Sequence, residues 1–265
     1  MRATSNFHTS NFLRLVILCW TVGVLLGSAS ALADSSGSHA VSELQPVPAG
    51  VSLPVQIGNT LRAGKTRPGS VFEVTTTQRV PISENLYLNR GAKLRGEVVA
   101  STAGDGTTAH PSVLTIRFAQ LSYRGQTVPV MTRAVAMANL MAVDDTFLSM
   151  QGGADRGNAS EASWTTRQVG GDLVVRSGWV GPVVGIGVRT VGRADFFGVY
   201  SLPVADGMQF PRAMGVFSTT AKGLYGYDTG STLGSSGGEI TVTNAEKRVV
   251  IRAGDNLLLE VLARR

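Results

Sequence analysis

Few side chains in this chain have the type and spacing that catalysis requires. His39 and His110 are the only histidines after residue 33, so a hydrolase triad would have to use one of them. Asp105 and His110 share one polar loop, but zinc needs three or four preorganised ligands and calcium needs several oxygens. The sequence therefore predicts no metal site, no cofactor and no catalytic residue.

Asp144 and Asp145 are the one pair of adjacent carboxylates that invites an acid/base interpretation. Consecutive side chains diverge by about 100° on a helix and face opposite sides on a strand, so the two acids do not readily share one substrate atom. We interpret the pair as a turn or helix cap. A carboxylate-based glycoside hydrolase, which needs two well-placed acids that the sequence does not locate, remains the enzymatic alternative.

Aromatic residues are concentrated in the last third of the chain. Such side chains stack on sugars or form hot spots for protein partners, although in most proteins they are core. Tyr225 and Tyr227 precede a Gly/Ser/Thr-rich run at 228–238, which is typical of an exposed loop. With Trp179 and Phe210 they make up the candidate binding surface: Tyr225, Tyr227, Trp179 and Phe210.

The elements that must position these residues are strands. Phe72, Val74 and Thr76 alternate with Glu73 and Thr75, and the same period of two recurs at 94–98, 114–118, 128–132 and 240–243. Pro and Gly residues separate the alternating segments. The chain is thus predicted to be mainly β, a barrel or sandwich of antiparallel strands with Gly-rich loops and at most one or two short helices.

Three local expectations follow from this pattern. Residues 86–88 and 93–98 form a hairpin whose turn places Gly91 at positive φ. Residues 134–150 have helical character, with Met137 and Leu140 on one stripe and Asp144-Asp145 interrupting it. Residues 164–200 form either an internal strand pair with glycine kinks or an apolar lip that faces a membrane or a partner.

The N-terminus has the three parts of a secretory signal. Arg2 and Arg14 are followed by an apolar core at 15–26 and by the small residues Ala31-Leu32-Ala33. We predict a signal peptide at 1–33 that is cleaved near Ala33, a flexible leader at 34–53, and a single β-domain at 54–265 with a Gly-rich, mobile insertion around 144–238. The exported chain then lies in the periplasm or outer cell envelope and retains no transmembrane helix.

Composition limits the remaining function classes. The only cysteine, Cys19, lies within the predicted signal, so the mature domain is expected to be free of disulfides. Without Arg2 and Arg14 the chain carries 22 basic and 18 acidic residues, interleaved along its length. Because no run of basic residues alternates with aromatics, nucleic acid is not an expected partner.

A family resemblance accompanies these strands. The residues that carry it are Leu61-Arg62-Ala63, Lys65 to Val74, Asn89 to Val98, Leu114 to Leu121 and Gly125 to Val130, with a weaker match at Val249 to Val261. This pattern of turns and strands resembles the C-terminal β-domain of VirB10/TrbI-type proteins of type IV secretion. The resemblance covers about half of the mature chain and implies that the C-terminal strand pairs near residues 57–80 to close a barrel or sandwich.

The resemblance extends to the fold and not to the accessory parts of that family. This chain lacks a retained membrane helix, a long Pro-rich spacer and an amphipathic helix pair. The predicted function is an exported, non-catalytic envelope protein that binds or assembles with other envelope proteins or with itself. A module that binds cell-wall carbohydrate through exposed aromatics is the alternative.

Overall fold

The computed structural model describes residues 46–148, 163–203 and 210–263. In these ranges the chain is mainly β, with antiparallel strands and one helix, which confirms the predicted fold class. The predicted signal at 1–33 and leader residues 34–45 lie outside the described residues. The first strand, β1 (Ser52–Ile57), begins two residues before the expected start of the β-domain.

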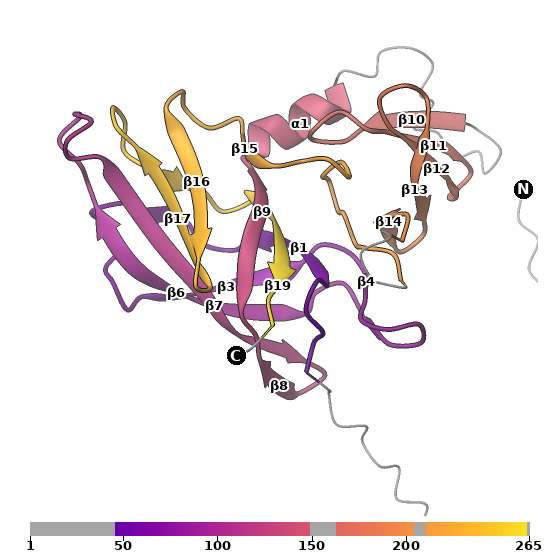
Figure 1. Cartoon of the computed structure of the whole chain (residues 1–265), viewed down its shortest axis with the longest axis horizontal. Helices are drawn as coiled ribbons and strands as arrows, with labels where there is room; N and C mark the ends of the chain where they lie inside the picture. The colour runs from indigo at the N-terminus through magenta and orange to yellow at the C-terminus, as the bar shows by residue number, and fades with distance from the viewer. Residues whose placement is uncertain (1–45, 149–162, 204–209, 264–265) are drawn as a thin grey trace, which may run out of the picture. The chain divides into compact units, whose positions relative to one another are not determined.

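A large sheet curls into a nearly closed barrel (Figure 1). Its strands follow the order β15-β9-β19-β1-β3-β6-β7-β17-β16, β8 also pairs with β7, and all neighbours are antiparallel except β15 and β9. Across the remaining gap the backbone N–H of Ala134 donates to the Ser235 hydroxyl at 3.0 Å. Besides β1, the strands are β3 (Val71–Thr76), β6 (Lys93–Thr102), β7 (Ser112–Tyr123), β8 (Gln126–Pro129), β9 (Thr132–Ala138), β15 (Gly223–Tyr225), β16 (Ser231–Ser236), β17 (Glu239–Asn244) and β19 (Asn256–Val261).

The barrel interior is filled by the alternating residues that the sequence pattern predicts. On β3, Phe72, Val74 and Thr76 are buried, whereas Val71 and Glu73 are exposed. The inward side chains of the other strands join the same core cluster. Each aliphatic side chain removed from water in this way stabilises the fold by about 1.5–3 kcal/mol, which makes the interior the main source of barrel stability.

Gly96 on β6 shows how tightly this interior is packed. A Cβ atom at Gly96 would lie only 2.4 Å from the ring of Phe72, its cross-strand partner. Phe72 in turn packs edge-on against Phe118, with ring centroids 5.7 Å apart. The register of β6 and β7 shifts at Gly96, as in a β-bulge, and bulges increase the local twist that closes a barrel.

One predicted hairpin is wrong. Residues 87–88 form β5 (Tyr87–Leu88), which pairs with β4 (Val80–Pro81) in a separate two-stranded ladder, while β6 pairs with β3 and β7. Gly91 has a φ of 89°, as expected for the turn, but its N–H bonds to Thr76. The pattern identified the strands and the turn correctly; alternation alone does not specify which strand is the partner.

The C-terminal strands close the barrel near the predicted place. β18 (Val250–Ile251) pairs with β2 (Leu61–Arg62), and β19 pairs with β1 on one side and β9 on the other. On β19, Leu257 and Leu259 point into the barrel core, whereas Leu258 belongs to a second core outside it. A strand buried on both faces reads as a continuous apolar run, which explains the sequence Leu257-Leu258-Leu259.

A five-stranded antiparallel meander covers that outer face (Figure 1). The stretch 164–200 therefore forms more than the expected strand pair. The second core combines Ala136 and Ala138 of β9 with Val174, Val183 and other side chains of the meander. Its strands are β10 (Ser163–Arg167), β11 (Leu173–Ser177), β12 (Gly181–Val184), β13 (Thr190–Asp195) and β14 (Gly198–Ser201).

The predicted helix at 134–150 is only half correct. Its first part is β9, in which Met137 pairs with Leu257 and is fully buried in the barrel. Helix α1 (Leu140–Leu148) begins after Asn139, whose side chain caps it by accepting the N–H of Ala142 at 2.8 Å. Burial on both faces of β9, with Met137 in the barrel core and Ala136 and Ala138 in the second core, thus overrides the helix propensity of alanine and methionine at 134–138.

Candidate functional site

Two of the four aromatics singled out from the sequence are tied into the scaffold. The Tyr227 hydroxyl donates to the carboxylate of Asp255 at 2.7 Å, and its ring packs against the barrel core. Burial, and then the negative charge of Asp255, raise the pKa of Tyr227. The Tyr225 ring packs against the second core, and its hydroxyl accepts the N–H of Lys222 at 3.1 Å.

Only one member of the predicted surface is well exposed. Phe210 is partly buried against the barrel core, like Tyr227. Trp179 has 55% of its surface exposed. The structure therefore keeps Trp179 as a surface aromatic and assigns Tyr225, Tyr227 and Phe210 at least partly to packing.

Exposed apolar side chains gather on the loops of the five-stranded sheet. Eleven large hydrophobic side chains are exposed in the described residues, and seven of them fall within 24 residues of sequence. Concentrated exposure of this kind marks interaction surfaces, whereas scattered single residues do not. The seven are Trp179, Val180, Ile186, Val188, Phe196, Phe197 and Leu202.

Four of these residues form what we call the aromatic patch: Trp179, Val180, Phe196 and Phe197. They occupy the β11–β12 and β13–β14 turns, at one end of the small sheet. The rings of Trp179 and Phe196 stack with centroids 5.6 Å apart and planes inclined by 27°. Stacking across two turns fixes their relative position, so the patch is an ordered surface.

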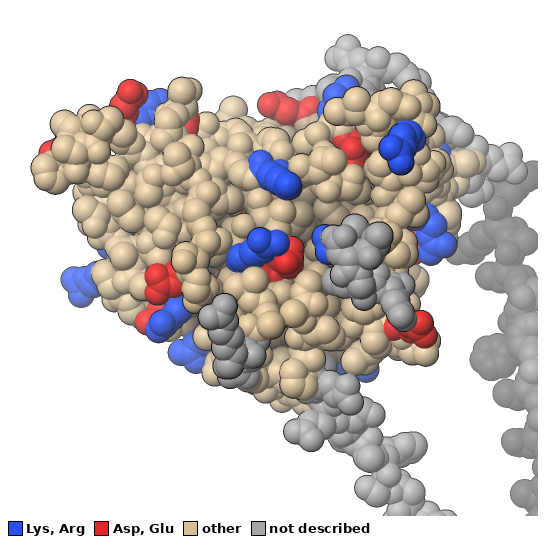
Figure 2. Space-filling view, viewed as in Figure 1, with Lys and Arg blue, Asp and Glu red and all other residues tan. Residues whose placement is uncertain are grey.

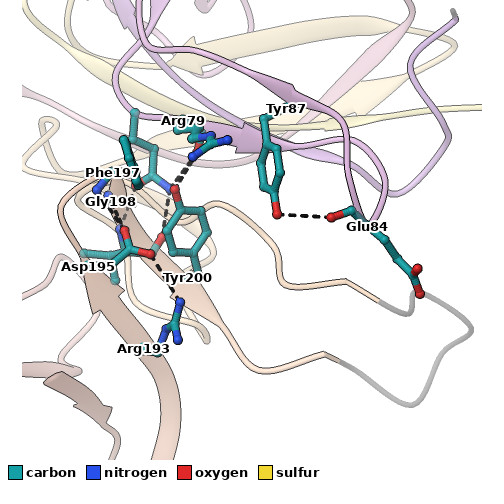
Figure 3. A network of polar contacts seen from close by, with 10 residues as sticks. Arg79, Glu84, Tyr87, Arg193, Asp195, Phe197, Gly198 and Tyr200 are labelled. Atoms are coloured by element: carbon teal, nitrogen blue, oxygen red, sulfur yellow. Dashed lines mark hydrogen bonds and ion pairs between the residues drawn. The ribbon is translucent and has the colours of Figure 1, made fainter. Parts of the chain in front are cut away.

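Asp195 builds the turn that presents Phe196 and Phe197. One of its carboxylate oxygens accepts the N–H of Phe197 at 2.8 Å and that of Gly198 at 3.2 Å (Figure 3). Its other oxygen lies 3.4 Å from the Arg193 guanidinium. Side-chain capping of this kind is the usual role of aspartate in tight turns. Asp195 is thereby committed to structure.

Gln78 joins this turn to the barrel. Its amide NH₂ donates to the carbonyl of Val199 at 2.9 Å, and its amide oxygen accepts the N–H groups of Val199 and Gly215 at 3.0 and 2.9 Å. Gln78 is 5% exposed and follows β3, more than 120 residues earlier in the chain. One side chain thus supplies the acceptor for two backbone N–H groups and a second donor to the Val199 carbonyl, which also accepts the N–H of Met214 at 2.9 Å.

Arg79 continues the contact between the two parts. Its guanidinium lies 3.9 Å from the ring centroid of Tyr87 and 4.6 Å from that of Phe197, a double cation–π contact (Figure 3). Its backbone N–H donates to the Phe197 carbonyl, and its carbonyl accepts the Tyr200 hydroxyl. Burial, with a further contribution from Asp195, raises the pKa of Tyr200, so this phenol stays neutral.

The acids and histidine that invited a chemical interpretation do not converge on this site. Asp144 and Asp145 lie side by side within α1, both exposed, and do not interrupt the helix. The Nδ1 atom of His110 lies 3.1 Å from the Asp105 carboxylate in the exposed β6–β7 loop. The Thr107 hydroxyl also donates to Asp105 and is the main cause that lowers the pKa of this carboxyl. No group of three or more metal-binding side chains occurs among the described residues.

The outer face of the barrel has a polar groove of about 560 Å³. The only carboxylate among its described lining residues is Glu73, which pairs with Lys93 at 2.9 Å. On the face shown in Figure 2, basic and acidic side chains are scattered between large uncharged areas. Of these surfaces, the aromatic patch is the one whose geometry is both apolar and fixed.

Sequence reasoning named Trp179 but missed its stacking partner Phe196 and the cation–π partner Phe197. A local signal was present, since Phe196 and Phe197 stand between Asp195 and Gly198, both of which favour turns. Large aromatic side chains at the tip of a turn tend to stay exposed, because few core residues lie within their reach. Residues 78–79 carried no such signal, because their contacts depend on tertiary structure.

Comparison of the chain with models of known protein families, with curated proteins and with solved structures finds no match. The VirB10-type resemblance therefore stays a prediction. Within the described ranges, no helix combines the length and hydropathy needed to cross a bilayer.

Proposed function

We propose that this chain is an exported, non-catalytic envelope protein whose β-domain binds or assembles with other chains, VirB10-like in fold. The observation that carries the proposal is the aromatic patch. It places a tryptophan and two phenylalanines on the surface in fixed positions, and aromatic anchors of this kind dominate protein interfaces. The partner is another envelope protein or a second copy of the chain.

The scaffold around the patch supports an assembly role. Gln78 and Arg79 hold the β13–β14 turn against the barrel, and Asp195 closes that turn. The β11–β12 turn is joined to it by the stacked rings of Trp179 and Phe196. A surface ordered before binding loses little conformational entropy when a partner arrives. An envelope protein that works by docking benefits from this rigidity.

The chain beginning at Asp34 is the material for the test. Sedimentation velocity over a range of concentrations measures self-association, and a photo-crosslinker in place of Val180, which is 45% exposed within the patch, captures a different partner in intact cells. We expect a specific adduct or oligomer that the double substitution Trp179→Ser/Phe196→Ser abolishes. A crosslinker at Val71, which is 53% exposed on the barrel, is the matched control. Identical adducts from both positions, or a strict monomer without adducts, would contradict the proposal.

A carbohydrate-binding module is the second candidate, and Trp179 favours it. An indole with more than half of its surface exposed can stack on a sugar ring. Tyr225 and Tyr227 support this alternative less, because both are partly buried. In a pull-down with peptidoglycan, Trp179→Ala would remove binding while Tyr225→Ala would leave it. Absence of binding by the unaltered chain eliminates this candidate.

A further inference from the structure

The opposite end of the five-stranded sheet carries a second, different apolar feature. The loop from Gly185 to Arg189 joins β12 and β13 and is closed by a hydrogen bond from the Gly185 N–H to the Arg189 carbonyl at 2.9 Å. The Val188 N–H also donates to the Gly185 carbonyl at 3.2 Å. Ile186 and Val188 are 89% and 88% exposed, more than any other large hydrophobic side chain in the described residues. We call Ile186, Gly187 and Val188 the aliphatic tip.

The backbone of the tip is strained in a way that keeps Val188 outward. Val188 has a φ of 63°, and Arg124 is the only other described residue besides glycines with positive φ. For a β-branched residue this conformation is a true outlier. An asparagine would occupy the same position with less strain and would be more soluble. Strain and solvation therefore both oppose valine here, which indicates that its side chain serves a contact outside the domain.

Positive charge accompanies the tip. Arg189 ends the loop, and the register places Arg167 at the same end of the sheet, since Arg167 pairs with Leu173 and Leu173 with Val184. Among the described residues of the sheet and its loops, the one acid at this end is Asp172, which is 2% exposed and accepts two hydrogen bonds from Thr219 at 2.7 and 2.8 Å. Asp172 is thus withdrawn from the surface, and exposed arginines flank an aliphatic projection.

We propose that the aliphatic tip inserts into the interfacial region of an anionic lipid bilayer. Ile186 and Val188 would enter the acyl boundary, while Arg167 and Arg189 contact lipid phosphates. A protein partner fits the tip less well, because valine is under-represented in protein hot spots, which favour tryptophan, tyrosine and arginine in closed pockets. The tip is convex and aliphatic, whereas the aromatic patch lies at the far ends of β12 and β13.

Co-sedimentation with vesicles tests this inference. The chain beginning at Asp34 is mixed with vesicles of phosphatidylcholine alone or of equal parts phosphatidylcholine and phosphatidylglycerol. We expect binding to the anionic vesicles that falls about tenfold or more in Ile186→Ser/Val188→Ser, because two buried aliphatic side chains are lost. Val71→Ser removes an aliphatic side chain that is 53% exposed on the barrel and should bind normally. Arg167→Gln/Arg189→Gln should weaken binding and its dependence on salt.

Val188→Asn separates a lipid contact from a folding defect. Asparagine tolerates positive φ, so this variant should melt at a higher temperature and yet bind anionic vesicles more weakly. The proposal is overturned if the unaltered chain does not bind anionic vesicles, if it binds neutral vesicles equally well, or if the tip variants bind as it does. Trp179→Ser/Phe196→Ser should leave vesicle binding unchanged, which keeps this outcome independent of the proposed assembly function.

Discussion

The barrel and the five-stranded sheet treat apolar side chains in opposite ways. In the strands of the barrel the apolar residues point into the barrel or, on β9 and β19, into the second core, and Val71 is the one large hydrophobic side chain that is well exposed. The five-stranded sheet buries one set of side chains in the second core and exposes seven others on its loops. The barrel therefore supplies stability, and the smaller sheet displays the surfaces available for contacts.

The two regions are nevertheless one folding unit. β9 and β19 contribute side chains to both cores. One face of these two strands lines the barrel interior, and the other face packs against the smaller sheet. Gln78 adds a polar contact between the two regions, through its hydrogen bonds to the backbone of Val199 and Gly215. We call this contact the Gln78 clamp. The loops of the smaller sheet can expose apolar residues because its strands are anchored on this wall.

The largest expected effect comes from breaking the clamp. Gln78→Leu leaves the N–H groups of Val199 and Gly215 without their acceptor and removes one of two bonds to the Val199 carbonyl, which should lower the free energy of unfolding by about 4 kcal/mol. Chemical denaturation measures the loss, and hydrogen exchange should show faster exchange in β14 than in β3. Gln56→Leu, at an exposed position of β1, is the control and should change stability by less than about 0.5 kcal/mol. Equal losses in the two variants would show that the clamp is unimportant.

Overpacking the barrel should cost somewhat less. Gly96→Ala drives a methyl group into the ring of Phe72, and we expect a loss of about 2–3 kcal/mol in thermal or chemical unfolding. Gly234→Ala provides the contrast, because its nearest neighbour would be 4.0 Å away. That variant should be neutral or slightly stabilising, since alanine has less freedom to lose on folding. The barrel interior is not close-packed at Phe72 if Gly96→Ala unfolds like the unaltered chain.

Tyr227 offers a pH test of the barrel side. Its pKa is raised in the folded state, whereas an unfolded tyrosine ionises near pH ~10, so this contribution is complete below that pH and is lost as pH rises above it. Tyr227→Phe removes the bond to Asp255, costs about 2 kcal/mol at neutral pH, and should make the alkaline decline shallower. Tyr123→Phe, whose hydroxyl is buried without a hydrogen-bond partner among the described residues, should have no such cost. An unchanged alkaline slope in Tyr227→Phe would refute this assignment.

The smallest effect on stability is expected at the aromatic patch. Trp179→Ser/Phe196→Ser alters two exposed side chains and should change the free energy of unfolding by about 0.5 kcal/mol or less. Denaturant titration beside the assembly measurement checks this. A loss as large as that of Gly96→Ala would mean that the patch serves packing, and the contrast between the two regions would weaken.

The sequence specified local structure far better than partners. Alternation at 71–76 and 94–98 correctly predicted buried faces. No local rule brings Gln78 to Val199, which lies 121 residues later in the chain. Such a contact forms only when the barrel and the five-stranded sheet pack against each other. No short window of sequence contains both contacting residues.

The candidate surface was harder to predict, for a related reason. Composition marks aromatics as good contact residues but does not say which side of a strand faces a core. Tyr227 and Phe210 resemble Trp179 in type and in their glycine-rich or polar surroundings, yet they pack against the barrel. The exposure of an aromatic side chain depends on which other segments pack against it. The tertiary structure determines this, and the local sequence does not.

The position of β19 between β1 and β9 governs when a nascent chain can fold. The first and last strands of the described barrel are neighbours, so synthesis up to about Val261 must finish before the sheet becomes continuous. A growing polypeptide consequently lacks one strand of the sheet until its end is made, which prolongs its exposure to proteases. Removal of the final strand would leave two unpaired strand edges in the middle of the sheet. We expect this deletion to lower stability far more than a deletion of the same length in a peripheral loop.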